Sequence, residues 1–124
     1  MGPCITNLGD LATAIGAHVL SSVADASRIA VSCVYAGDRM SDLLNEATAS
    51  TLLVTHLANP HLIRAAELLD IPAICLLNGI VPDPELVASA LHSGKVLMVS
   101  PVGMGETCQV LRALGLVLRG DGAA

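Results

Sequence analysis

The fold is decided between Thr51 and Pro101, where three short apolar runs follow one another: Thr51-Leu-Leu-Val-Thr55, Pro72-Ala-Ile-Cys-Leu-Leu77 and Lys95-Val-Leu-Met-Val-Ser100. Each run is too short and too uniformly apolar for an amphipathic helix, and polar or turn-forming residues follow each of them. Such runs are typical of strands that are buried on both faces of a parallel sheet, where the alternation of apolar and polar residues disappears. We therefore predict three central parallel strands.

Two helical patterns separate these strands, one at residues 59–70 and the other at residues 83–93. Strands that alternate with helices imply right-handed crossovers, which place the helices on the faces of the sheet. The sequence thus predicts a single α/β domain over residues 1–124, with a mainly parallel sheet and helices on its faces. Ligands of such sheets bind beyond the carboxyl ends of the strands.

Further elements flank this centre, and we expect a core over about residues 6–114 with a frayed tail at 119–124. The expected elements are a helix at 8–15, capped by Thr6 or Asn7 and ended by Gly16; a short strand at 17–20; a strand at 28–35, at an edge of the sheet; a helix from Asp38 or Ser41 to about Ala47; a helix from about 104 to 114, ended by Gly115; and a short strand or packing segment at 116–118.

The composition excludes several classes of partner. Acidic residues outnumber Lys and Arg by 11 to 6, the net charge is −5, and Tyr35 is the single aromatic residue, so we expect no nucleic-acid partner. No apolar run approaches the roughly 18 residues of a membrane span, and we expect no membrane partner. The first residues lack a basic segment followed by an apolar core, so we expect a cytoplasmic location.

The four cysteines, Cys4, Cys33, Cys75 and Cys108, are far apart and form no Cys-x-x-Cys pair. Zinc sites normally need such paired spacing, so we expect four reduced thiols, no metal and no cofactor.

Three segments resemble the DRTGG domain family, which is related to the N-terminal domain of HPr kinase/phosphorylase. They are Tyr35-Ala-Gly-Asp-Arg-Met-Ser-Asp-Leu-Leu44, Arg64-Ala-Ala-Glu-Leu-Leu-Asp-Ile-Pro-Ala-Ile74 and Gly79-Ile-Val-Pro-Asp-Pro-Glu85. The resemblance runs from about Leu8 to Leu114, and Gly79 is what remains of the Thr-Gly-Gly segment in the family's name. It implies the fold of the HPr kinase N-terminal domain and a regulatory role. The phosphate-binding loop of the kinase half, Gly-x-x-x-x-Gly-Lys-Ser/Thr, does not occur in this chain.

Candidate ligand-binding residues follow the predicted strands. His56, Asn59 and His61 come after the first strand, and Pro60 suits the first position of the next helix. Two imidazoles and an amide at a helix N-terminus are suited to an anion or phosphate. The alternative is that Asn59 only caps the helix and that the histidines are ordinary loop residues.

The loops after the second and third strands add further candidates. In Asn78-Gly79 a backbone amide could approach a ligand, because glycine permits positive φ, although a plain turn also explains the pair. Gly103, within Pro101-Val-Gly-Met-Gly105, could line the same site with backbone. Asp38 and Asp42 are one helical turn apart; Asp38 suits a helix cap, and Asp42 stays open as a ligand-binding residue.

Two functional hypotheses follow, and a third is weaker. The first is a non-catalytic regulatory or ligand-sensing domain that binds a small anionic metabolite or nucleotide at the strand ends. The second is a protein-interaction module that acts through its homo-oligomer and a separate partner protein. An enzyme that uses His56 or His61 would be the third, but no complete catalytic set is present.

The apolar content also predicts a homo-oligomer, most simply a dimer. Hydrophobic residues make up 53% of a chain that is too short to bury all of them in one core. We expect the helix at 83–93 and the segment 116–118 to supply the interface, because an edge strand can pair with its copy.

Overall fold

The computed structural model describes residues 6–21, 29–37, 51–56 and 60–120. The elements in these ranges are β1 (Thr6–Asn7), α1 (Leu8–Ile15), β2 (His18–Ser21), β3 (Ala30–Val31), β4 (Cys33–Ala36), β5 (Thr51–Thr55), α3 (Pro60–Leu68), β6 (Ala73–Leu76), α4 (Pro84–His92), β7 (Val96–Val99), α5 (Met104–Ala113) and β8 (Val117–Arg119).

Within the described residues, the main sheet has six strands in the order β2-β7-β6-β5-β4-β8. All neighbouring strands are parallel except β2, which runs antiparallel to β7. The prediction of an α/β domain with a mainly parallel sheet is therefore confirmed. A separate two-stranded antiparallel pair joins β1 to β3.

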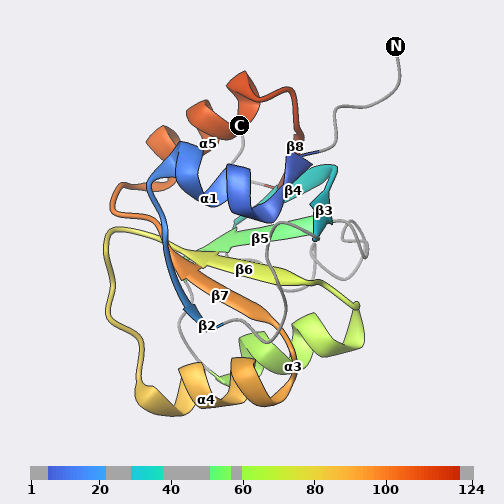
Figure 1. The fold of residues 1–124 in the computed structure, drawn as a ribbon, viewed down its shortest axis with the longest axis vertical. Helices are drawn as coiled ribbons and strands as arrows, with labels where there is room; N and C mark the ends of the chain where they lie inside the picture. The colour runs from blue at the N-terminus through green and yellow to red at the C-terminus, as the bar shows by residue number, and fades with distance from the viewer. Residues whose placement is uncertain (1–5, 22–28, 38–50, 57–59, 121–124) are drawn as a thin grey trace.

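Helices cover both faces of the main sheet (Figure 1). On one face α1 and α5 pack through residues such as Leu11 and Leu111 on a cluster that includes Val54 and Met98 of the sheet. On the other face α3 and α4 pack on a second cluster, with Leu62 and Leu86 against the sheet. The sheet thus separates two hydrophobic cores, and the three central strands contact both of them. Every residue of β5, β6 and β7 is buried, which is why their sequences lack alternation.

Local signals set the ends of several helices as predicted. The backbone N–H of Asp10 donates to the side chain of Asn7 over 2.8 Å, so Asn7 caps α1. Gly16 ends α1 in the left-handed region, with φ of 69°. Pro60 is the first residue of α3, as predicted, and the structure adds a second case, because Pro84 is the first residue of α4.

The expected strand at 28–35 differs from the structure in two respects. It is divided into β3 and β4, which belong to different sheets, and β4 is not an edge strand because β5 and β8 flank it. In the described part of the sheet, the edge next to β4 is formed instead by β8. This strand follows α5 in the chain and pairs in parallel with β4. Arg119, expected in the frayed tail, is the last residue of β8 and pairs with Tyr35.

The helix expected between Asp38 and Ala47 lies outside the described residues. Among the helices that the structure does describe, none combines the length and the apolar character that crossing a membrane requires.

Candidate functional site

The carboxyl ends of the central strands meet at one end of the sheet. Thr55 of β5 is in register with Leu76 of β6, and Leu76 is in register with Val99 of β7. The residues that follow these positions therefore emerge side by side, as expected for a parallel sheet. His56 follows β5 directly, and the Asn78-Gly79 pair follows β6 after Leu77.

Asn78 and Gly79 form a tight turn after β6. Both have positive φ, 61° and 62°, and the N–H of Ile80 donates to the carbonyl of Leu77 over 3.3 Å. Two consecutive left-handed residues are what a type I′ turn needs, and Asn-Gly is the pair that adopts it at least cost. The side chain of Asn78 is exposed at the tip of this turn.

Two hydrogen bonds tie the turn to the segment that follows β7. The N–H of Asn78 donates to the carbonyl of Val102 over 2.9 Å, and the N–H of Gly79 donates to the carbonyl of Ser100 over 2.8 Å. Gly103 lies against the same turn, since a Cβ on it would be 3.2 Å from Oδ1 of Asn78. The structure therefore brings three predicted residues, Asn78, Gly79 and Gly103, together.

These hydrogen bonds change how the turn can contact a ligand. The amides of Asn78 and Gly79 are engaged within the protein, so they are not the donors that we expected a ligand to meet. The exposed Asn78 side chain offers an amide NH2 donor and a carbonyl oxygen instead. Positions 79 and 103, the two glycines at this turn, add no side chains beside it.

A buried polar pair supports the segment after β7. The hydroxyls of Ser100 and Thr107 are hydrogen-bonded over 2.9 Å, and both residues are fully buried. The N–H of Val102 also donates to Ser100 Oγ, over 3.4 Å. Thr107 belongs to the first turns of α5, whose N-cap is Gly103. The pair thus holds the start of α5 against the end of β7.

The remaining predicted residues are less closely defined. His56 is exposed directly after β5, and His61 is exposed in the first turn of α3. Asn59 and Asp42 lie outside the described residues, so the cluster of His56, Asn59 and His61 stays a prediction.

The thiols beside this site are structural. Burial raises the pKa of Cys75 to about 12, although a backbone hydrogen bond involving Ser100 opposes the shift. Burial also raises the pKa of Cys108, against the opposing charge of Arg112. A nucleophilic cysteine needs a lowered pKa, so neither thiol is activated. Within the described ranges, no three His, Cys, Asp or Glu side chains are grouped as metal ligands would be.

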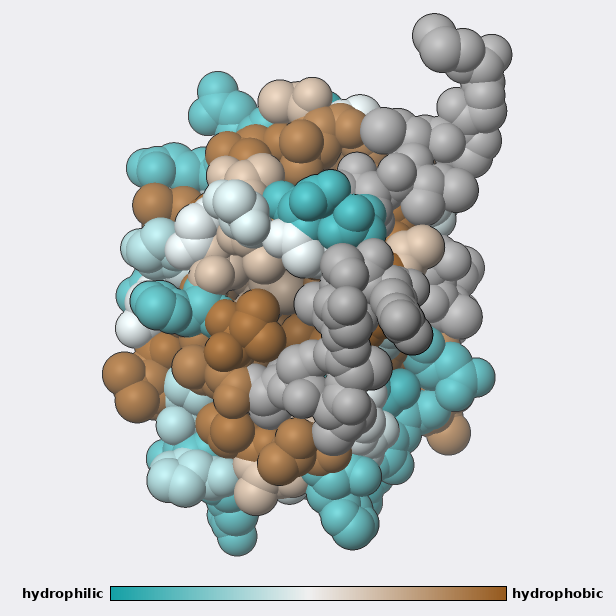
Figure 2. All heavy atoms as spheres, in the orientation of Figure 1, coloured by the Kyte–Doolittle hydropathy of each residue, from teal (hydrophilic) through white to brown (hydrophobic). Residues whose placement is uncertain are grey.

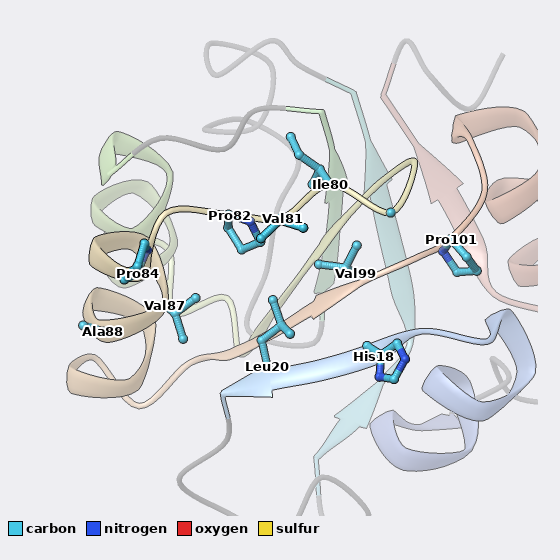
Figure 3. A pocket seen from close by; sticks show the side chains of 11 residues that line it. His18, Leu20, Ile80, Val81, Pro82, Pro84, Val87, Ala88, Val99 and Pro101 are labelled. Carbon is cyan, nitrogen blue, oxygen red and sulfur yellow. The ribbon is translucent and has the colours of Figure 1, made fainter.

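A cavity of about 570 Å³ adjoins the turn on the face that carries α4 (Figure 3). The strand β2 and the 80–82 loop form opposite walls, α4 closes one end, and Pro101 lies at the other end. It is lined by His18, Leu20, Gly79, Ile80, Val81, Pro82, Pro84, Val87, Ala88, Val99 and Pro101.

Sequence reasoning missed this cavity, although it includes the predicted residue Gly79. Its walls join β2 to α4 and to a loop about 60 residues later, because β2 pairs with β7 at the edge of the sheet. The one local signal was His18, a polar residue that begins an otherwise apolar run, His18-Val-Leu20.

A second groove, of about 610 Å³, lies between α3 and α4. Its lining mixes Arg64 and His92 with the carboxylates of Glu67 and Glu85, and Ser93 Oγ donates to Glu67. Opposite charges are already neighbours along this groove, so it does not select for a ligand of one sign.

Comparison with known proteins identifies a similar fold. Neither the known protein families nor the curated proteins include a match to the sequence. Among solved structures, the chain is similar to the CBS and DRTGG domains of the regulatory region of Clostridium perfringens pyrophosphatase, determined with its activator, diadenosine tetraphosphate. The TM-score is 0.71 at 12% sequence identity.

This similarity covers 90% of the chain and 48% of the pyrophosphatase chain, so the protein spans about half the length of that structure. At this identity the likeness concerns the fold. The chain thus has a mixed α/β fold related to that CBS and DRTGG region, as the sequence resemblance implied.

Proposed function

We propose that this chain is a non-catalytic regulatory domain that senses a small anionic metabolite or nucleotide beyond the carboxyl ends of β5, β6 and β7. One observation carries the proposal: hydrogen bonds and close contact join the Asn78-Gly79 turn to residues 100–103, the segment that follows β7, where these strands end. An exposed amide on a rigid turn, flanked by two glycines, is suited to ligand contact at little entropic cost.

The structural neighbour supports a sensing role. That protein region is regulatory and was determined with a nucleotide activator, and 90% of the present chain matches its fold. A cytoplasmic location, predicted from the sequence, belongs to this proposal.

Three buried groups close to the proposed site are unsuited to nucleophilic catalysis, which supports a binding role. The hydroxyls of Ser100 and Thr107 are buried and bonded to each other, and the raised pKa of Cys75 keeps its thiol protonated near neutral pH. A nucleophile needs an exposed, activated side chain, and none of these three groups meets that condition.

A ligand screen tests the proposal. Unfolding temperature is measured with inorganic phosphate, ribose 5-phosphate, AMP, ATP and diadenosine tetraphosphate, and hits are confirmed by calorimetry. We expect at least one of these anions to raise the unfolding temperature, because a ligand that binds only the folded state stabilises it. No shift with any compound would contradict the proposal.

Two isosteric variants locate the site. Asn78→Asp replaces the amide of the turn by a carboxylate and should weaken anion binding about tenfold, the effect of roughly 1.4 kcal/mol. Gln109→Glu adds the same charge at an exposed position of α5 and serves as the matched control. Equal losses in the two variants would mean that only net charge matters and that Asn78 is not part of the site.

A second candidate function is the interaction module that acts through a homo-oligomer and a separate partner protein. The observation in its favour is that β8 is an edge strand whose Val117 is 49% exposed, while Leu91 of α4 is 47% exposed. Light scattering at micromolar concentration should give the mass of two chains, and Val117→Lys should shift it to one. Val19→Lys, on the opposite edge strand, is the control; a single-chain mass for the unmodified protein contradicts the dimer.

A further inference from the structure

The cavity beside the Asn78-Gly79 turn has the lining of a small-molecule site. Its volume of about 570 Å³ falls within the roughly 300–1,000 Å³ of such sites. None of the described residues that line it is Asp, Glu, Lys or Arg, and among these described residues His18 supplies the one polar side chain. An ionised group would lose its hydration in this lining without compensation, so the part of a ligand that enters must be uncharged.

The walls of the cavity are held in place before any ligand binds. Pro82, Pro84 and Pro101 have fixed φ angles, and Pro82 is buried. The hydrogen bond from Gly79 N–H to the Ser100 carbonyl anchors the start of the 80–82 loop, which forms one wall. A preformed wall reduces the entropy that a ligand must overcome.

An irregularity in β2 shapes the opposite wall. His18 pairs with Val99 and Val19 with Met98, but the next pair is Ser21 with Leu97, so Leu20 is an extra residue in the ladder. Such bulges redirect side chains and are enriched beside binding sites. The side chains of His18 and Leu20 reach the cavity, and that of Val19 does not line it.

The cavity also has a polar end and an apolar end. His18 lies near Pro101 at one end, whereas Val87 and Ala88 of α4 close the apolar end (Figure 3). Gly79, which also lines the cavity, is hydrogen-bonded to Ser100, the residue before Pro101. Figure 2 shows apolar surface over this part of the molecule, where α4 and β2 lie. A molecule in the cavity would therefore place its polar edge toward His18 and toward the proposed anion site.

We propose that this cavity holds the uncharged heteroaromatic base of a nucleoside or nucleotide. The flat apolar faces of such a ring match the proline and aliphatic walls, and its edge nitrogens or oxygens match the imidazole of His18. The inference rests on the proposed function, because it assigns the anionic part of the same ligand to the Asn78 turn. Within that function it selects nucleotides over anions that lack a ring.

Separate probes test the two parts of the site. Adenosine, guanosine, cytidine and uridine carry a base and no charge, ribose 5-phosphate carries the anion without a base, and octanoate supplies an apolar chain. In the unmodified protein, at least one nucleoside should shift the methyl NMR signals of Val87 and Val99 and leave that of Val117 unchanged. The matching 5′-monophosphate should bind more tightly than the nucleoside.

Two neighbouring residues of β2 provide a matched pair of variants. Leu20 and Val19 are 41% and 43% exposed, but only Leu20 lines the cavity. Leu20→Asp should weaken nucleoside binding at least about tenfold, and Val19→Asp should change it less than about twofold. His18→Phe, which keeps a ring and removes its nitrogens, should also weaken the nucleoside and leave octanoate binding unchanged.

The outcomes separate this inference from the proposed function. If ribose 5-phosphate bound and none of the nucleosides did, the base site would be overturned and the anion site would stand. Nucleoside binding with no gain from the 5′-phosphate would keep the base site and contradict the anion site. If octanoate displaced the bound nucleoside and had the higher affinity of the two, the inference would be overturned, since the cavity would then prefer an aliphatic chain to a ring.

Discussion

Oδ1 of Asn78 lies 3.2 Å from the position that a Cβ on Gly103 would occupy, although 25 residues separate the two in the chain. A side chain at position 103 would therefore press on the side chain of Asn78, whereas the backbone itself does not call for glycine, because Gly103 has an ordinary φ of −81°. A Cβ at position 103 would require the exposed side chain of Asn78 to shift by a few tenths of an ångström.

Gly103→Ala and Gly105→Ala should therefore have opposite effects on the stability of the protein. In Gly103→Ala the new Cβ presses on the Asn78 side chain, and alanine is a poorer N-cap for α5 than glycine. This substitution should lower the free energy of unfolding by about 0.5–1 kcal/mol. Gly105 lies within α5, and a Cβ added there would meet no atom within 4 Å. Gly105→Ala should therefore raise the free energy of unfolding by about 0.5–1 kcal/mol. Urea denaturation measures both, and a stabilising Gly103→Ala would contradict the contact.

The last residue of the described chain, Gly120, should tolerate no side chain. It has φ of +94°, and a Cβ there would lie 2.3 Å from the carbonyl oxygen of Ala36. Gly120→Ala should force the end of β8 away from β4 and lower the hydrogen-exchange protection of Leu118 at least about tenfold.

Gly16→Ala is the control for Gly120→Ala. Gly16 also has positive φ, +69°, but its nearest contact would be Pro101 Cγ at 3.9 Å. That substitution should cost about 1–2 kcal/mol of backbone strain and leave the protection of Leu118 relative to the core unchanged. Equal effects on Leu118 in both variants would refute the clash with Ala36.

The buried Ser100–Thr107 pair should show strong coupling. Thr107→Val keeps the shape of the side chain and leaves the Ser100 hydroxyl without this partner, so it should cost about 1–3 kcal/mol. The double variant with Ser100→Ala should cost less than the sum of the two single losses. A double-mutant cycle by urea denaturation measures the coupling, and strict additivity would contradict it.

Stability should fall at alkaline pH because of Cys75. Its pKa is raised from about 9 to about 12 in the folded state, so folded chains keep a proton that unfolded chains release above pH 9. The stabilisation that Cys75 contributes to the folded state is fully present below pH 9. It is lost as the pH rises toward 12, by about 1.4 kcal/mol per pH unit.

The variant Cys75→Ala isolates this effect. It should be less stable at pH 8 because it leaves a small cavity, but its stability should decline less between pH 9 and pH 11. Other groups that titrate in this range cancel in the comparison. Parallel stability curves for the two proteins would show that Cys75 does not contribute.

Much of the local structure could be predicted because it depends on residues close in sequence. The strand Thr51–Thr55 and the helix Leu8–Ile15 have the predicted bounds, and Asn7 and Gly16 cap the helix as expected. Burial on both faces erases alternation, and a cap acts within one helical turn, so both leave a readable local pattern.

The candidate site was predictable only in part. The strand order of a parallel crossover sheet implies that Asn78, Gly79 and Gly103 emerge at the same end, and the structure brings them together. That the Asn78 and Gly79 amides are already engaged was not apparent, because their acceptors at Val102 and Ser100 belong to another loop.

The sequence by itself determined the alternation of buried strands and helices, through the short range of periodicity and capping. Only the tertiary structure decided that β4 is internal, that β2 is antiparallel and that His18 lines a cavity with Val87. Each of these features joins segments far apart in the chain. Strand pairing and side-chain packing between such segments depend on the complete arrangement of the sheet, and no local pattern in the sequence specifies it.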